Sequence, residues 1–382
     1  MKNKTLFAVV IVSLLMLLIG CSTVVDISYM KSANVDMGQY RNIAVASAIP
    51  YNKGYMPSSA YMRYYDFDSS LYPVYSSYSK SLPSDVASYA TDAVIDALSR
   101  NGFFKIMYPA ETDAIITLSR MGMSSSARFA EAGIDAVIIP SIDNMDVDEY
   151  SRVYIDSYTE KYDPSTGIKT KIPHYTYAYY QRVSVTLSLT VVDARTERII
   201  AKRTYTKQNP TYEEYTYRPY GTGYILPYSS VNNPYYTFRS QLNSFKKSII
   251  NDFIPTRISS SVELMGNKPK IKSLESAYKA AEDGNLTLAY NAFMAEWDAS
   301  GHIPSAYNAA VIQAAGGDLS GAIEFLSSVR QQVQNSEING LYSRMVAYKA
   351  EDDKAKAQIS GESTPVSGDA GSIYSIYSAL GK

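Results

Sequence analysis

Residues 183–191 read Val-Ser-Val-Thr-Leu-Ser-Leu-Thr-Val, a strict alternation of aliphatic and small polar side chains. A period of two places every aliphatic residue on one face of an extended chain, and no helix has that period. We therefore expect a long half-buried strand over 175–193, a turn over 193–198 and a returning strand over 198–208. This predicted hairpin requires the fold to contain an antiparallel pair of strands.

The rest of residues 41–258 predicts helices and strands in alternation. Ser84 is a suitable N-cap for a helix over 84–102, because an apolar stripe of helical period follows it. The other expected elements are strands at 43–49, 103–108 and 133–143, two helical pieces within 110–133, and a helix at 237–253. This order predicts an α/β sandwich of two or three layers around a mixed sheet.

The C-terminal third predicts a different, all-helical architecture. Residues 284–289 read GNLTLA and residues 317–322 read GDLSGA, an offset of 33 with alanines aligned on both sides. The pattern resembles the tetratricopeptide repeat, whose period is about 34. We expect repeats over 270–358, with a third, degraded copy, and a flexible tail over 359–382. Such repeats either form a peptide-binding groove or cap the other domain. Together with the α/β sandwich, they make the predicted fold class α+β with two domains.

The N-terminal sequence predicts where in the cell the protein is localised. Lys2 and Lys4 precede an apolar run of about a dozen residues, which is the length of a signal-peptide core and too short to cross a bilayer. Leu18-Ile19-Gly20-Cys21 follows and resembles the lipobox of bacterial lipoproteins. The resemblance implies a signal peptide over 1–20, cleavage after Gly20 and lipidation of Cys21, the single cysteine in the chain. A polar tether is expected over 21–40. The same resemblance implies that Ser22, in the position after the cysteine, favours the outer membrane, with the protein facing the periplasm.

Tyrosine is the compositional outlier, with 36 residues against 10 phenylalanines and 1 tryptophan. Most tyrosines lie in three segments, 51–80, 145–180 and 209–236, which we interpret as inserts in the α/β domain. Tyrosine suits binding loops because it offers a large rigid face and a hydroxyl, although the inserts could also pack on themselves. The candidate binding residues for a protein or glycan partner are Tyr64, Tyr65, Tyr179, Tyr180, Tyr220, Tyr224, Tyr228, Tyr235 and Tyr236.

Few residues are suited to catalysis. His174 and His302 are the only histidines and are expected at the surface, and no nucleotide, metalloprotease or hydrolase motif occurs. The carboxylates within 143–149 are expected to be a solvated strand end rather than a calcium site. We therefore predict a protein that is not an enzyme and has no metal or cofactor. The net charge of −1 does not favour nucleic acid as a partner.

Two short motifs in the α/β domain resemble a known group of lipoproteins. They are the opening strand Ile43-Ala44-Val45 and the hairpin VVDARTERII at 191–200. The group includes the curli-secretion channel lipoproteins, the N-terminal domain of the Tol-system propeller protein and penicillin-binding-protein activator lipoproteins. We predict an envelope adaptor or assembly factor; the alternative is a subunit of an oligomeric outer-membrane export channel. A glycan hydrolase is held in reserve, since it would need two carboxylates about 5 to 10 Å apart in a groove.

Overall fold

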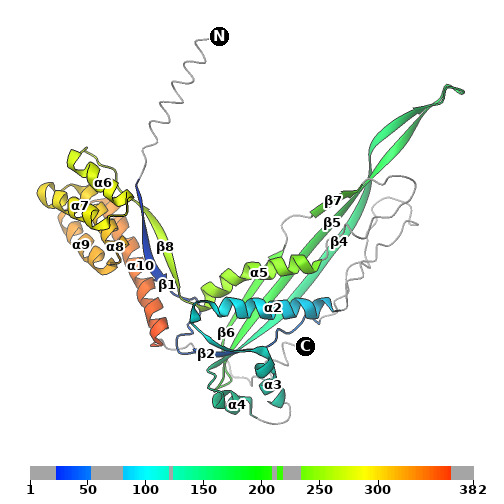
Figure 1. Cartoon of the computed structure of the whole chain (residues 1–382), viewed down its shortest axis with the longest axis horizontal. Coiled ribbons are helices and arrows are strands. Elements are labelled where there is room, and N and C mark those ends of the chain that lie inside the picture. Colours follow the sequence, from blue (N-terminus) through cyan, green and yellow to red (C-terminus); the bar gives the residue numbers. More distant parts are fainter. Residues whose placement is uncertain (1–22, 53–80, 120–123, 209–212, 218–233, 363–382) are drawn as a thin grey trace. The chain divides into compact units, whose positions relative to one another are not determined.

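The computed structural model describes residues 23–52, 81–119, 124–208, 213–217 and 234–362 (Figure 1). The chain forms two compact units. The α/β unit is built from Asn34–Ile254, and the helical unit combines the chain up to Ala33 with Pro255–Ser360. The helical unit is thus assembled from both ends of the sequence. The observed class is α+β, as predicted, but the second unit contains a two-stranded ribbon in addition to its helices.

The α/β unit is organised around a mixed sheet. Its order is β3-β2-β4-β5-β6, with β7 paired to β5 beyond the end of β6. β2 runs parallel to β3 and β4, whereas β4–β5, β5–β6 and β5–β7 are antiparallel. The strands are β2 (Asn42–Val45), β3 (Lys105–Met107), β4 (Ala136–Tyr162), β5 (Lys169–Asp193), β6 (Ile199–Gln208) and β7 (Glu213–Tyr217).

Helices cover both faces of the sheet near its base, which makes three layers there. Helices α2 (Leu82–Leu98) and α5 (Pro234–Phe253) pack on one face. They meet the alternate aliphatic residues of β5, from Val183 to Val191, all of which are buried. Helices α3 (Pro109–Ser119) and α4 (Ser125–Glu131) pack on the other face, where Phe129 is fully buried.

Apart from β7, which was not predicted, the order of elements in the α/β unit is the predicted one. Gly133 follows α4 with a positive φ of 70°, as expected for the terminator of that helix. One predicted cap is wrong: α2 begins at Leu82 behind Ser81, so Ser84 lies inside its first turn. The helix starts earlier because Pro83 is compatible with the first helical turn, where its missing N–H costs no hydrogen bond.

The interpretation of 145–180 as an insert is wrong. β4 and β5 continue through this segment and stay paired from Ala136 with Asp193 to Tyr162 with Lys169. The sequence does contain a signal for a hairpin. Residues 163–167 read Asp-Pro-Ser-Thr-Gly, which is typical of a turn, and the tyrosine-rich segments before and after this turn are of similar length. The segment 51–80 lies almost wholly outside the described residues. From 209–236 the structure describes β7 and the start of α5.

The helical unit consists of a two-stranded ribbon and five described helices. The ribbon pairs β1 (Val24–Lys31) with β8 (Thr256–Glu263) in antiparallel register. The helices are α6 (Glu275–Glu282), α7 (Leu286–Ser300), α8 (Ile303–Ala315), α9 (Leu319–Gln332) and α10 (Ser336–Ser360). In the part of the chain that the structure describes, no helix is long and apolar enough to cross a membrane.

The predicted polar tether over 21–40 is wrong. Val25 and Ile27 of β1 are buried on one face while Val24, Asp26 and Ser28 are exposed on the other. The period of two is visible in the sequence, but it identifies a strand only when a partner is available. That partner, β8, lies more than 200 residues later and is rich in serine, which hid its strand character.

The β1–β8 ribbon packs against helices of its own unit. Val25 and Ile27 of β1 and Val262 of β8 belong to the same buried cluster as alanines of α6 and α8. Tyr29 stacks on Tyr348 of α10, with ring centroids 4.5 Å apart. The ribbon therefore covers part of the apolar surface of α8, beside the neighbouring helices.

Two details of the predicted repeats can be compared with the structure. Asn285 and Asp318, 33 residues apart, each cap a helix by accepting a hydrogen bond from a backbone N–H three residues later. The expected third copy is one long helix, α10, rather than a helix pair. α10 also runs to Ser360, into the segment predicted as tail, of which residues 363–382 lie outside the described chain.

Candidate functional site: the β4–β5 arm

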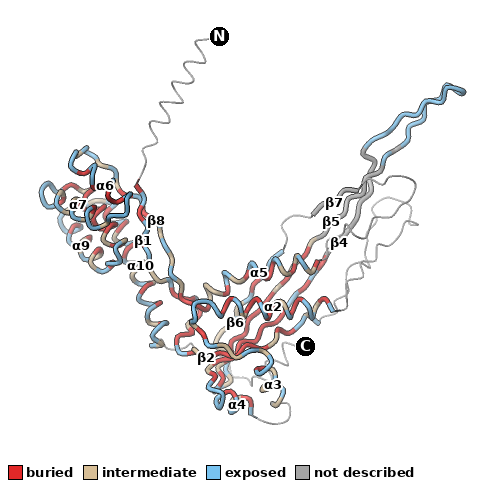
Figure 2. The backbone as a smooth tube through the Cα atoms, viewed as in Figure 1, coloured by how far each residue is buried: buried red, intermediate tan, exposed pale blue. Residues whose placement is uncertain are grey.

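The β4–β5 hairpin extends well beyond the core of the α/β unit. Among the residues whose burial the structure describes, the outermost buried aliphatic ones are Val147 in β4 and Val183 in β5. From there β4 continues to Tyr162 and β5 starts as far out as Lys169. We call residues 148–182 the arm; at about 3.3 Å per residue its β4 side is roughly 50 Å long. Figure 2 shows that its outer part is exposed, in contrast to the buried base of the same strands.

A compact turn closes the outer end of the arm. The N–H of Asp163 donates to the carbonyl of Ile168 at 3.0 Å, and the N–H of Gly167 donates to the carbonyl of Asp163 at 2.8 Å. Gly167 has a φ of 72°, which glycine adopts without strain. Ser165 donates from its hydroxyl and its N–H to the Asp163 carboxylate, and these bonds lower the pKa of Asp163. The turn is thus an ordered end of the hairpin.

The outer part of the arm, residues 157–174, presents side chains to solvent on both of its faces. We call it the tip. Glu160 and Lys169 form an ion pair across the strands at 3.5 Å, and Thr159 contacts His174. Its exposed large apolar side chains have between 44% and 60% of their surface accessible and are Tyr158, Tyr162, Ile168 and Ile172. A two-stranded ribbon without a core is only marginally stable in water, so the tip is suited to contact another molecule.

Strand β7 adds a third strand to the inner part of the arm. Its register pairs Tyr217 with Tyr177 and Glu213 with Gln181. The backbone of Tyr179 lies opposite Tyr215, and that of Tyr180 lies opposite Glu214. Two of the tyrosine-rich segments, 145–180 and 209–236, are therefore joined in one ribbon. The sequence did not predict this pairing.

The candidate tyrosines fall into three groups. Tyr179 and Tyr180 belong to the arm. Tyr235 and Tyr236 lie in the first turn of α5, where Tyr235 packs against the core with Arg239 5.6 Å from its ring, while Tyr236 is 67% exposed. The candidates that lie outside the described residues are Gly20, Cys21, Tyr64, Tyr65, Tyr220, Tyr224 and Tyr228.

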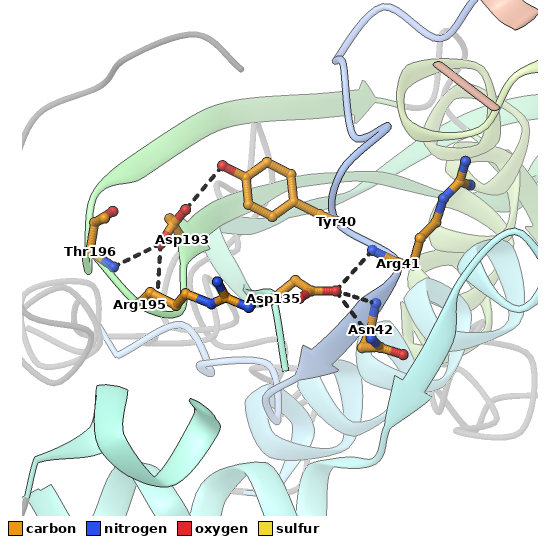
Figure 3. A network of polar contacts seen from close by, with 7 residues as sticks. All are labelled: Tyr40, Arg41, Asn42, Asp135, Asp193, Arg195 and Thr196. Atoms are coloured by element: carbon orange, nitrogen blue, oxygen red, sulfur yellow. Dashed lines mark hydrogen bonds and ion pairs between the residues drawn. The ribbon is translucent and has the colours of Figure 1, made fainter. Parts of the chain in front are cut away.

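A polar network joins the strand ends at the base of the sheet (Figure 3). The Asp193 carboxylate accepts hydrogen bonds from the Tyr40 hydroxyl at 3.0 Å and from the N–H groups of Arg195 and Thr196 at 2.9 and 2.7 Å. The Asp135 carboxylate accepts from the N–H groups of Arg41 and Asn42 at 3.2 and 3.0 Å. The network therefore contains Asp193, Arg195 and Thr196 of the hairpin motif, together with Tyr40, Arg41 and Asn42, which directly precede the Ile43-Ala44-Val45 motif.

The network's protonation states agree with a structural role. Burial raises the pKa of Asp193, but the hydrogen bonds donated by Thr196, Tyr40 and Arg195 outweigh burial and lower it. Burial, together with the nearby Asp193 carboxylate, raises the pKa of Tyr40 to about 12. An ionised Asp193 and a neutral Tyr40 are the partners that a stable hydrogen bond needs. The network fixes the ends of β2, β4 and β5 to one another.

Two expectations about polar residues need correction. The carboxylates of 143–149 lie within β4 and not at a strand end, and Asp143 accepts hydrogen bonds from Ser141 and Ser188 at 2.7 and 2.6 Å. His302 is buried rather than at the surface, and its ring contacts the Ser305 hydroxyl at 2.8 Å and the Lys268 carbonyl at 3.3 Å. Among the described residues, no group of histidine, cysteine and carboxylate side chains is arranged to hold a metal ion.

Comparisons with known proteins found similarity only among solved structures. No family model and no curated protein matches the chain. The chain is similar to PelC. A dodecamer of a PelC point variant from Paraburkholderia phytofirmans is 9% identical, with 60% of this chain and 97% of that chain covered and a TM-score of 0.24. The PelC dodecamer from the same organism is 10% identical, with 60% and 96% covered and a TM-score of 0.24. These values are too low for a function to be carried over.

Proposed function

We propose that this chain is a lipid-anchored lipoprotein of the cell envelope that binds a protein or cell-wall partner as an adaptor or assembly factor. It acts without catalytic turnover and is held on the outer membrane, facing the periplasm. The observation that supports binding is the arm, whose tip exposes tyrosine, isoleucine and charged side chains without a core of its own. A partner that covers the tip would bury apolar surface and order a marginal ribbon in the same step.

The proposed lipid anchor is supported by the sequence Leu18-Ile19-Gly20-Cys21, which resembles a lipobox. Several acyl chains on Cys21 hold a protein durably on a membrane, whereas one chain alone is marginal. We expect Cys21→Ala to move the protein from the membrane fraction to the soluble fraction of the envelope. Cell fractionation with mass spectrometry of the N-terminal peptide tests this, and an unmodified Cys21 in the wild-type protein would contradict the anchor.

Site-specific crosslinking in intact cells tests the role of the arm. A photoreactive phenylalanine analogue placed at Tyr158 or Tyr162 is expected to form a discrete adduct with one envelope component. The same analogue at Tyr236 is the matched control, because that side chain is at least as exposed and lies on α5. Adducts of equal yield at all three positions, or no adduct at the tip, would refute binding through the arm.

A second candidate function is a subunit of an oligomeric outer-membrane export channel. Support comes from the length of β4 and β5, since long hairpins line the channel in the curli-secretion family that the sequence resembles. This function requires several copies of the chain to bring their arms together. In the crosslinking experiment it predicts adducts whose masses are multiples of this chain, instead of an adduct with a different partner.

We further propose that α6 to α10 are tetratricopeptide-like repeats that act as a scaffold. The helix caps at Asn285 and Asp318 support a repeat of 33 residues. Because the β1–β8 ribbon packs on α6, α8 and α10, we propose that it occupies the groove in which such repeats commonly bind peptides. The arm is therefore the better candidate for the partner-binding element.

A further inference from the structure

The helical unit holds the chain from Thr23 onward. The Thr23 hydroxyl donates to the carboxylate of Glu282, the last residue of α6, at 2.8 Å. The Thr23 carbonyl accepts from the N–H of Leu264 at 2.8 Å, and Val24 is paired with Glu263 in the ribbon. Thr23 is also buried. Its position relative to α6 and β8 is consequently set by hydrogen bonds on two sides.

Almost no chain separates this fixed point from the proposed anchor. Only Ser22 lies between Cys21 and Thr23. Two peptide steps of 3.8 Å span at most about 8 Å between the Cα atoms of residues 21 and 23. A flexible tether of some twenty residues would let a domain move far from the membrane, but a connection of this length does not.

We propose that the helical unit lies directly on the bilayer surface, with the start of β1 and the α6–α7 turn as its membrane-facing end. This inference rests on the proposed lipidation of Cys21. The acyl chains must occupy the hydrocarbon region, which holds the Cys21 backbone at the level of the headgroups. Thr23 and the end of α6 are then held within roughly 10 to 15 Å of that level, given the reach of two residues and one side chain.

The chemistry of this end agrees with a neutral lipid surface. Val24 is exposed beside the anchor, and Leu288, in the first turn of α7, is 54% exposed. Exposed aliphatic side chains gain free energy by entering the boundary between headgroups and acyl chains. Glu263, Glu282 and Asp283 place negative charge at the same end, which disfavours anionic lipids. We therefore assign the surface to zwitterionic phospholipid.

The opposite end of the helical unit supplies an internal control. Ala33 is hydrogen-bonded to Gln358 near the end of α10, and Ile359 beside it is 45% exposed. Ten residue steps, most of them within β1, separate Thr23 from Ala33, which is at most about 33 Å at 3.3 Å per residue. Leu288 and Ile359 are thus exposed aliphatic side chains near the two ends of the β1 strand.

Tryptophan quenching in vesicles tests the orientation. Leu288→Trp and Ile359→Trp are introduced separately into the full chain, expressed with its N-terminal 20 residues and reconstituted in phosphatidylcholine vesicles with a nitroxide on a fraction of the headgroups. Trp297, the single native tryptophan, is buried and contributes the same background to both variants. We expect quenching of the added tryptophan to be at least twofold stronger at position 288 than at position 359. Equal quenching, or stronger quenching at 359, would overturn the inference.

The lipidation of Cys21 and the orientation of the helical unit on the bilayer are tested by separate measurements. Mass spectrometry of the purified protein reports the acyl groups on Cys21 independently of the quenching. If Cys21 is unmodified, the lipid-anchor proposal is wrong, and the thiol is coupled to a maleimide-bearing phospholipid before reconstitution. The short connection to Thr23 is the same in that sample, so the ratio of quenching at the two positions decides the orientation in either case.

Discussion

Gln358 forms a pair of hydrogen bonds with the main chain of Ala33, 325 residues earlier in the sequence. Its Oε1 accepts from the Ala33 N–H at 2.8 Å, and its Nε2 donates to the Ala33 carbonyl at 3.1 Å. Glu351 and Asp352 accept from the N–H groups of Ser32 and Met30 in the same way. Helix α10 therefore satisfies backbone groups on the edge of β1 that is not paired with β8. The N-terminal strand β1 is therefore held on one edge by side chains of α10 and on the other edge by pairing with β8.

We expect Gln358→Ala to destabilise the helical unit by about 1 to 3 kcal/mol, because it leaves buried backbone groups of Ala33 without partners. Urea unfolding followed by Trp297 fluorescence measures this, since the single tryptophan lies in the core of that unit. Gln332→Ala removes the same side chain from an exposed position at the end of α9 and should leave the midpoint unchanged. Equal midpoints for the two variants would contradict the role of Gln358.

The stability of the helical unit should fall in acid. Hydrogen bonding to Ser32 lowers the pKa of Glu351. Burial alone would raise the pKa of Asp352, but the hydrogen bonds donated by Lys356 and Met30 outweigh burial and lower that pKa. Because both folded pKa values lie below the unfolded values of about 4, this stabilisation is complete at neutral pH and is lost as pH falls from about 5 through the folded pKa values. Urea midpoints measured by Trp297 fluorescence between pH 7 and pH 3 test this.

Asp352→Asn isolates the charge of Asp352, because asparagine can still accept from the Met30 N–H. We expect this variant to lose stability at pH 7 and to show a weaker dependence on pH than the wild type. Asp353→Asn is the neighbouring control, since that carboxylate is about half exposed and pairs with Lys349 on the surface of the same helix. If Asp353→Asn flattened the pH dependence as much as Asp352→Asn, the assignment would be wrong.

Tyr40→Phe is expected to destabilise the α/β unit by about 1 kcal/mol, because it removes the hydrogen bond to Asp193 while keeping the buried ring. Hydrogen–deuterium exchange of peptides from β2 and β5 reports this opening separately from the helical unit. Tyr108→Phe, at an exposed position, is the control and should leave exchange unchanged. Slower or unaltered exchange in Tyr40→Phe would count against the network.

The same pair predicts a loss of stability in alkali. The pKa of Tyr40 is raised to about 12 from an ordinary value of 10.0, first by burial and then by the nearby carboxylate of Asp193. A raised folded pKa means that the stabilisation is complete below pH 10 and is lost as pH rises toward 12. Exchange in wild type should therefore approach that of Tyr40→Phe over this interval.

Two isoleucines of one hairpin test where the core of the α/β unit ends. Ile138 in β4 is fully buried, so Ile138→Ala should cost about 2 to 5 kcal/mol through lost burial and the cavity that remains. Ile172 in the tip is exposed, so Ile172→Ala should change stability by less than about 0.5 kcal/mol. Thermal unfolding followed by circular dichroism compares them, and a cost at Ile172 similar to that at Ile138 would mean that the tip packs within the folded chain.

The regular elements were predicted wherever a residue's surroundings come from its own neighbours in sequence. The aliphatic period of two over 183–191 and the helical stripe over 237–253 each identify a buried face without reference to a partner. Likewise, Asn285 and Asp318 act as caps because the N–H groups that they satisfy lie three residues away. These features depend on local geometry, which the sequence specifies directly.

The candidate site was predicted less well. Tyr179 and Tyr180 were singled out by composition and do belong to the arm, but their segment was interpreted as an insert. The exposed residues of the tip, such as Tyr158 and Ile172, were not singled out, although the turn at 163–167 marked the end of a hairpin. Composition identified the segment, and only the pairing of β4 with β5 explained its form.

The sequence by itself determined the secondary structure of the core, the two kinds of architecture and a lipobox-like N-terminus, because each depends on residues that are close along the chain. Only the tertiary structure decided that residues 24–31 are a strand, that His302 is buried and that the ribbon covers part of α8. Each of these depends on a partner far away in sequence: β8 for β1, Lys268 for His302, and β1 for α8. A period of two shows that a strand can form, but the free energy that keeps it folded comes from the distant surface on which it packs.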